Sequence, residues 1–196
     1  AARSPEPASA AGAVRPESGR WTLLMIHTPY PVVLDACVLY PSLLRDLLLR
    51  LGLKGLYQTK WTAAIQDEWQ RNLLKNREDI TPERVQRTAQ LMNAALPDAM
   101  VTGYEKLIDS ISLPDPGDRH VVAAAVRCNA EVIVTLNLKD FPGECLTQFD
   151  IESLHPDDFI SDLFDLNHAL ALQAAAEQRA SMRRPAKTGE ERRRVP

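Results

Sequence analysis

The chain of 196 residues has no apolar run that approaches the roughly 18 residues of a membrane-spanning helix. Cysteine is scarce: Cys37, Cys128 and Cys145 are odd in number, widely spaced and form no C-x-x-C pair. They indicate reduced thiols rather than a disulfide set or a zinc site. G-x-S-x-G, P-loop and G-x-G-x-x-G motifs are also absent, which argues against hydrolase-elbow and nucleotide-loop enzymes. We therefore expect a cytoplasmic protein without membrane association.

The net charge of −3 is unevenly distributed. Residues 179–194 carry seven basic residues against two glutamates, a net +5, so the rest of the chain carries −8. A negative body argues against a broad binding surface for duplex DNA. It is compatible with a nucleic-acid enzyme if bound metal cancels part of an acidic site.

Composition divides the chain into four expected parts. Residues 1–24 form a disordered extension, because residues 1–20 are rich in Ala, Ser, Pro, Gly and Arg. This stretch lacks the apolar centre of a secretory signal. Residues 25–160 form the main domain, residues 161–184 a C-terminal helical region, and residues 185–196 a disordered basic tail.

Short apolar runs alternate with helical patterns along the main domain. The runs of strand type are Pro31–Asp35 and Glu131–Thr135. Helices are expected at 41–51, 60–76, 81–96, 115–128 and, as one or two helices, 156–184. Strands that alternate with helices indicate a parallel sheet covered on its faces, and therefore an α/β fold.

Two acidic residues interrupt these apolar segments. Asp35 ends the first strand, and ligands in open α/β sheets bind beyond the carboxyl ends of strands. Glu68 is expected on a helix face that it shares with Trp61, Ala64, Ile65 and Asn72. A buried carboxylate must be paired, hydrogen-bonded or bound to a cation. A turn or N-cap role for Asp35, and a solvated margin for Glu68, remain alternatives.

Further acids and short polar residues follow along the chain. Asp118 begins a helix after Asp115 and Pro116, a pattern that fits both helix capping and metal binding. Three polar residues follow the second strand, where they would orient a ligating carboxylate or form an Asx-turn: Thr135, Asn137 and Asp140. Carboxylates that converge at one edge of the sheet would hold a hard cation such as Mg²⁺ or Mn²⁺.

Together these segments resemble the PIN domain family, most closely the VapC-like branch of bacterial toxin–antitoxin modules. The likeness is carried by the strand ending in Asp35, by Glu68 within a helix, by Leu113–Ala125 (LPDPGDRHVVAAA) and by Val134–Pro142 (VTLNLKDFP). It covers roughly residues 31–160 and leaves both tails unexplained.

The resemblance implies a Rossmann-like three-layer α/β/α fold with a central parallel sheet, and cleavage of RNA that depends on Mg²⁺ or Mn²⁺. It implies that Asp35, Glu68 and Asp118 form a catalytic, metal-binding triad with Asp140 as the fourth acid, and that Asp115 is an additional metal ligand. The family often has aspartate where this chain has Asn137, and this departure would weaken binding of a second metal.

Basic residues beside these acids are candidates for RNA binding. Arg119 and Lys139 would contact phosphates, unless they are only solvated surface charges. His120 is expected to face away from Asp118, so it is not assigned as a general base.

The toxin interpretation also implies a protein partner. The acidic stretch 144–165 and an apolar stripe would dock an antitoxin segment or form a homodimer. The stripe consists of Phe159, Leu163, Leu166 and Leu170. Packing of this helix on its own domain is the simpler alternative.

Two other functions remain open. A PIN-like fold could bind RNA or protein without catalysis, which Asn137 would favour. A phosphotransfer domain could use Asp35 as phosphoacceptor, although one such class usually has a second aspartate where this chain has Cys37.

Overall fold

The computed structural model describes residues 29–182. The expected disordered segments, 1–24 and 185–196, lie outside the described residues. Among residues 29–182 no helix is both long and apolar enough to cross a bilayer.

Four short parallel strands form the central sheet in the order β2-β1-β3-β4. They are β1 (Pro31–Leu34), β2 (Gln58–Lys60), β3 (Val132–Val134) and β4 (Glu152–Leu154). In the central pair, Val33 lies opposite Ile133 and Leu34 lies opposite Val134. These four side chains are completely buried, as expected for strands covered on both faces.

The longer helices follow the expected pattern, although those expected at 60–76 and 115–128 begin later, and the short helices at Ala36–Leu39 and Gly143–Leu146 were not expected. The helices are α1 (Ala36–Leu39), α2 (Ser42–Leu53), α3 (Ala63–Asn76), α4 (Pro82–Ala95), α5 (Arg119–Cys128), α6 (Gly143–Leu146), α7 (Pro156–Leu166) and α8 (His168–Ser181). The expected helix at 60–76 begins later, at Ala63, because Lys60 ends the edge strand β2. The side chain of Thr62 caps α3 by accepting a hydrogen bond from the Ile65 N–H at 3.1 Å.

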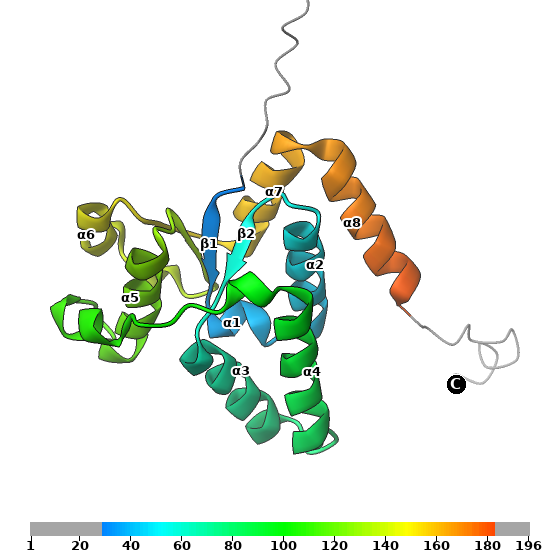
Figure 1. The fold of residues 1–196 in the computed structure, drawn as a ribbon, viewed down its shortest axis with the longest axis horizontal. Helices are drawn as coiled ribbons and strands as arrows, with labels where there is room; N and C mark the ends of the chain where they lie inside the picture. Colours follow the sequence, from blue (N-terminus) through cyan, green and yellow to red (C-terminus); the bar gives the residue numbers. More distant parts are fainter. Residues whose placement is uncertain (1–28, 183–196) are drawn as a thin grey trace, which may run out of the picture.

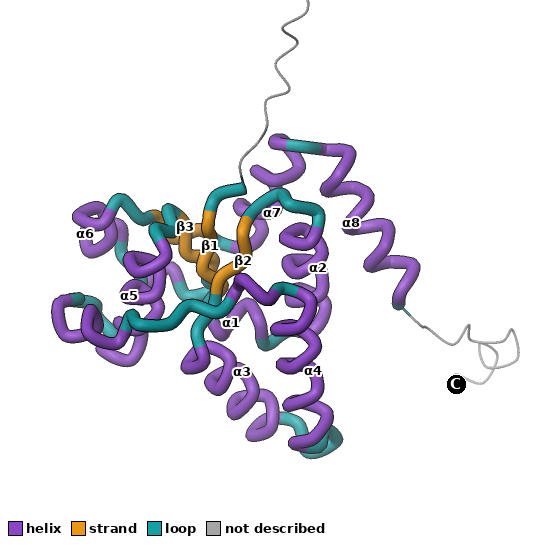
Figure 2. The backbone as a smooth tube through the Cα atoms, viewed as in Figure 1, coloured by secondary structure: helices purple, strands orange, loops and turns teal. Residues whose placement is uncertain are grey.

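Helices cover the sheet in layers, which gives the three-layer α/β/α fold expected from the sequence. Figure 1 shows α5 on one side of the strands and α2, α7 and α8 on the other. The tube view separates the strands from the surrounding helices (Figure 2). On α5, Val121 and Val122 and the three alanines after them are fully buried, and these small residues let the helix pack closely on β1 and β3.

The terminal helices α7 and α8 pack against the body of the molecule. Phe159 of α7 is fully buried, and its ring meets Tyr57 edge-on with centroids 5.0 Å apart. Leu163 is also fully buried, whereas Leu166 is 46% exposed. Half of the apolar stripe expected to dock a partner therefore packs inside its own domain, which was the simpler alternative.

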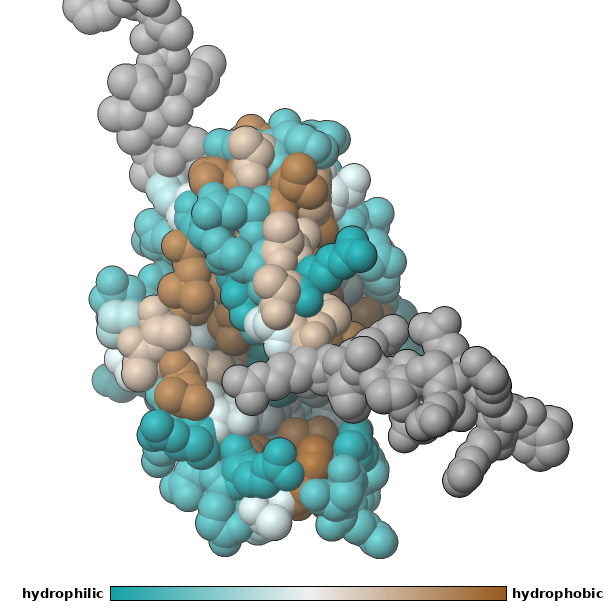
Figure 3. All heavy atoms as spheres, turned by 90° about the vertical axis from the view of Figure 1, so that its right-hand side faces the viewer, coloured by the Kyte–Doolittle hydropathy of each residue, from teal (hydrophilic) through white to brown (hydrophobic). Residues whose placement is uncertain are grey.

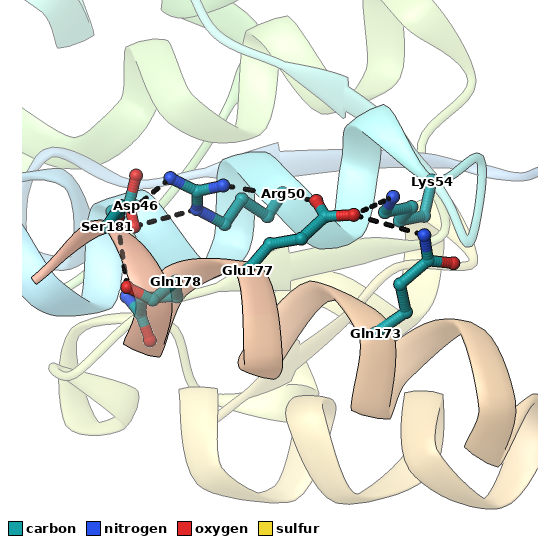
Figure 4. A network of polar contacts seen from close by, with 7 residues as sticks. All are labelled: Asp46, Arg50, Lys54, Gln173, Glu177, Gln178 and Ser181. Carbon is teal, nitrogen blue, oxygen red and sulfur yellow. Dashed lines mark hydrogen bonds and ion pairs between the residues drawn. The ribbon is translucent and has the colours of Figure 1, made fainter.

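Polar contacts join α8 to α2 (Figure 4). Glu177 accepts a hydrogen bond from Lys54 at 2.6 Å, and Gln178 donates to the Leu43 carbonyl at 2.7 Å. The face of the molecule on which α8 lies in Figure 1 shows patches of hydrophobic residues among hydrophilic ones (Figure 3). Helix α7 spans residue 160, the expected end of the main domain.

Candidate active site

Asp35 lies directly after β1, at the carboxyl edge of the sheet. Its backbone N–H donates to the Val134 carbonyl of β3 at 3.1 Å, which fixes the residue between the two central strands. Its side chain caps α1, because Oδ1 accepts a hydrogen bond from the Ala36 N–H at 2.6 Å. Only 5% of Asp35 is exposed. The N-cap alternative is therefore correct for this residue, and it leaves the position at the sheet edge unchanged.

Two side chains hold the second oxygen of Asp35. Thr135, which follows β3 and is fully buried, donates from its hydroxyl to Oδ2 at 2.8 Å. The thiol of Cys37 donates to the same oxygen at 2.9 Å. The Thr135 hydroxyl also accepts from the backbone N–H of Asn137 at 3.0 Å. Asp35 thus has a fixed orientation, set by the segment that follows β3.

Burial dominates the protonation of this group. It raises the pKa of Asp35, while the hydrogen bonds from Cys37, Thr135 and Ala36 lower it and the nearby charge of Glu68 raises it. Burial, together with the negative charge of Asp35, raises the pKa of Cys37 to about 12. Cys37 is therefore a neutral thiol that donates a hydrogen bond, and it is not a reactive thiolate.

Glu68 lies on α3 at the margin of the buried face. The fully buried residues of α3 are Ile65 and Trp69, whereas the Glu68 side chain is 36% exposed. The buried face of α3 is thus not the face that was expected to contain Glu68. Trp61 precedes the helix, and Asn72 is exposed. Glu68 still faces the site, because its Oε2 lies 3.7 Å from His120 Nε2 on α5.

The pKa of Asp118 is the clearest sign that the acidic residues lie near it. Burial, followed by the charges of Asp35, Asp115, Glu68 and Asp140, raises the pKa of Asp118 to about 6. Each of the acids expected at the site therefore acts on this carboxyl group. The four acidic residues are far apart in the sequence, at positions 35, 68, 115 and 140, and the charge of each acts on Asp118.

Comparison with known protein families shows to which family the chain belongs. A PIN domain model matches residues 31–139, more than half of the chain, and a model of the VapC50 C-terminal domain matches residues 156–191. The chain belongs to the PIN domain family. This agrees with the resemblance seen in the sequence.

One curated relative of this PIN domain protein is described as "Putative ribonuclease VapC50" from Mycobacterium tuberculosis (strain ATCC 25618 / H37Rv). It is 53% identical over 68 residues, which cover 35% of this chain and 40% of the relative. The match thus spans less than half of the relative. No solved structure matches the chain.

The other expected site residues of this PIN domain differ in their burial and in their hydrogen bonds. Asp140 is half-buried in a short 3-10 helix, Leu138–Asp140, and Asp115 is exposed and accepts a hydrogen bond from the Gly117 N–H at 2.7 Å. Asn137 reaches Thr135 through its backbone and not its side chain. Lys139 is exposed, whereas Arg119 is half-buried, and its Nε has no hydrogen-bond partner among the described residues.

The carboxylates fit a divalent cation in chemistry and charge. All the donors are hard oxygens. Burial, and after it the charges of the other carboxylates, raises the pKa of Asp118, and a bound cation would oppose this shift. Within residues 29–182, however, no three His, Cys, Asp or Glu side chains are arranged to hold a metal ion. The acids thus lie within electrostatic range of each other without forming the closed cage expected from the sequence. Because their like charges repel each other, the carboxylates remain in this open arrangement.

Sequence reasoning missed two participants. His120 was expected to face away from the site, yet it contacts Glu68. Helical spacing relates residues on one helix only, so it could not show this contact between α3 and α5. Cys37 was interpreted as a reduced thiol and as a departure from the phosphotransfer pattern, and not as a partner of Asp35, although its i+2 position brings its thiol to the carboxylate.

Proposed function

We propose that this PIN domain is a metal-dependent endoribonuclease and the toxin of a toxin–antitoxin module. The observation that carries the proposal is the influence of four carboxylates on Asp118 at the end of the sheet. Membership of the PIN family and the name of the ribonuclease relative support it. The phosphotransfer alternative receives no support from the family match.

Asp35, Glu68, Asp118 and Asp140 would hold Mg²⁺ or Mn²⁺, with Asp115 beside them. When bound, the cation neutralises charge on the scissile phosphate and activates the attacking water. The protein's own residues position the reactants: Thr135 and Cys37 fix Asp35, while Asn137 fixes Thr135 through its backbone. In-line attack would leave 5′-phosphate and 3′-hydroxyl ends.

The test is cleavage of a labelled RNA with Mg²⁺, with Mn²⁺ and with EDTA. Asp118→Asn preserves the shape of the side chain and removes its charge, so we expect it to abolish cleavage. Asp165→Asn on α7 is the matched control, because Asp165 is exposed and lies outside the acidic cluster. Equal cleavage by wild type and Asp118→Asn, or cleavage unaffected by EDTA, would refute the proposal.

The alternative is a PIN domain that binds RNA or protein without cleaving it. Asn137 favours this alternative, because it removes one negative ligand that the family often has. RNA binding by wild type, without metal binding and without cleavage under any of the three conditions, would establish it.

An antitoxin partner follows from the toxin proposal, and a homodimer is a second proposed assembly. Growth arrest on expression of wild type, relieved by Asp118→Asn or by the protein encoded by the adjacent gene, would support the toxin role. Cleavage in vitro without growth arrest would leave the nuclease and exclude the toxin.

A further inference from the structure

A groove of about 620 Å³ runs along α3, and Glu68 is the proposed metal-binding acid that lines it. Glu68 forms part of its wall, and His120 and Gly117 line the opposite side. The remaining lining residues all come from α3: Ala64, Asp67, Gln70, Arg71 and Leu74. A ligand that reaches the carboxylates from this side must therefore lie against α3.

Arg71 is the cation of this groove, since it is the one Lys or Arg among the lining residues that the structure describes. It follows Glu68 by three positions, so the two side chains share a helix face with Cβ atoms ~5–6 Å apart. Arg71 is exposed, and its recorded contact is a long hydrogen bond from Nε to the Asp67 carbonyl at 3.4 Å. No ion pair occupies its guanidinium within residues 29–182.

An available guanidinium beside a cluster of carboxylates is suited to a phosphodiester chain. The carboxylates repel an anionic ligand, whereas the guanidinium binds phosphate oxygens in a planar, two-point geometry. Gln70 and His120 add an amide and an imidazole to the wall, groups that form hydrogen bonds with base edges. Leu74 supplies apolar surface at the far end.

A single strand fits the size of the groove. Its volume is that of a small-molecule site, which matches about one or two nucleotides. Bases of single-stranded RNA are unstacked and accessible to such side chains.

We propose that Arg71 binds a backbone phosphate of single-stranded RNA next to the scissile phosphate, and so positions the strand in the groove along α3. This inference rests on the proposed ribonuclease function. Arg71 acts by positioning the strand and takes no part in the chemical step.

Binding is measured with a short labelled single-stranded RNA and the full chain carrying Asp118→Asn, which does not cleave. In this background we expect Arg71→Ala to weaken binding about tenfold. We expect the dependence of log affinity on log salt to fall by about 0.7, the value for one lost phosphate contact with a single strand. Arg71→Lys keeps the charge, so it should keep the salt dependence while losing part of the affinity.

Arg87→Ala is the matched control, because Arg87 is an exposed arginine on α4 outside the groove. It should bind RNA as the parent does. With Asp118 intact, Arg71→Ala should raise KM and leave kcat nearly unchanged, while Arg87→Ala changes neither.

Equal affinity and salt dependence for Arg71→Ala and Arg87→Ala would overturn the inference and leave the ribonuclease proposal standing. Equal competition by a blunt RNA duplex would also overturn it, because the strand could not then lie in the groove. If wild type cleaves no RNA, the proposed function itself fails and this inference fails with it.

Discussion

At the scale of single residues, the site depends on how one carboxylate is held. Asp35 receives hydrogen bonds on both oxygens, from its own helix on one side and from Thr135 and Cys37 on the other. Buried polar networks of this kind stabilise the structure only when every member is satisfied. Thr135 is the residue on which this network depends most, because it contacts Asp35, Cys37 and Asn137 together.

Thr135→Val tests this role with a side chain of the same shape. The substitution removes one of the two donors to Asp35 Oδ2 and the acceptor for the Asn137 N–H, and leaves Cys37 as the one side-chain donor to that oxygen among the described residues. We expect a loss of about 1–3 kcal/mol in the free energy of unfolding and a roughly 10- to 100-fold loss of cleavage. Urea denaturation and initial cleavage rates measure the two effects.

The control for this prediction is Thr147→Val. The Thr147 hydroxyl is exposed and donates to the Gly143 carbonyl, away from the acidic cluster. Its substitution should change stability by less than about 0.5 kcal/mol and leave cleavage intact. Equal behaviour of the two valine variants would contradict the positioning role of Thr135.

At the scale of elements, the sequence predicted the long helices and the two central strands, because both carry strong periodic signals. The central strands are runs of fully apolar residues, and α2, α4 and α5 have clear starts or stops. The edge strands β2 and β4 were not predicted, because each is three residues long and contains polar residues such as Gln58 and Glu152. Their strand conformation comes from pairing with β1 and β3, which no local pattern records.

In the candidate site, too, some positions could be predicted from the sequence and others could not. The position of Asp35 followed from its place at the end of a strand, whereas Glu68 and His120, which contact each other from two helices, are 52 positions apart in sequence. Such contacts depend on how α3 packs against α5, and one sequence alone does not determine this packing.

Gly52→Ala tests the packing of α2 against the edge strand. A methyl group at Gly52 would overlap the Thr59 hydroxyl of β2 and also contact the ring of Tyr57. Thr59 is buried, so the clash should lower the free energy of unfolding by about 1–3 kcal/mol, although alanine favours helix by about 1 kcal/mol. Gly143→Ala on α6 meets open space and should change stability by less than about 0.5 kcal/mol. A Gly52→Ala protein at least as stable as wild type in thermal denaturation would contradict the described packing.

At the scale of the whole molecule, the fold collects negative charge at one end of a parallel sheet. Burial and repulsion raise the pKa of Asp118 to about 6, from an ordinary value of 3.8, and burial raises that of Asp35 as well. Between about pH 4 and pH 6 these two carboxyl groups thus bind more protons in the folded protein than in the unfolded chain. By linkage, their contribution to stability without metal decreases as pH rises through this window.

The pH prediction compares wild type with Asp118→Asn in EDTA. The Asn variant does not titrate at this position, so its stability relative to wild type should improve as pH rises from about 4 to about 6. Thermal denaturation at several pH values measures the difference between the two proteins, which removes the contribution of other groups. Adding Mg²⁺ or Mn²⁺ at pH 6.5 should raise the Tm of wild type more than that of the variant. A difference that is constant across the window would show that Asp118 titrates normally.

The order of the strands has a consequence for the timing of activity during synthesis. β3 pairs with β1 on one side and with β4 on the other, so the residues of β1 can pair with β3 only after the ribosome has added partners 100 positions later. A nascent chain that stops before Asp140 carries only part of the acidic cluster. An enzyme that attacks RNA and is built in this way would remain harmless to the message that encodes it until the ribosome has passed Asp140.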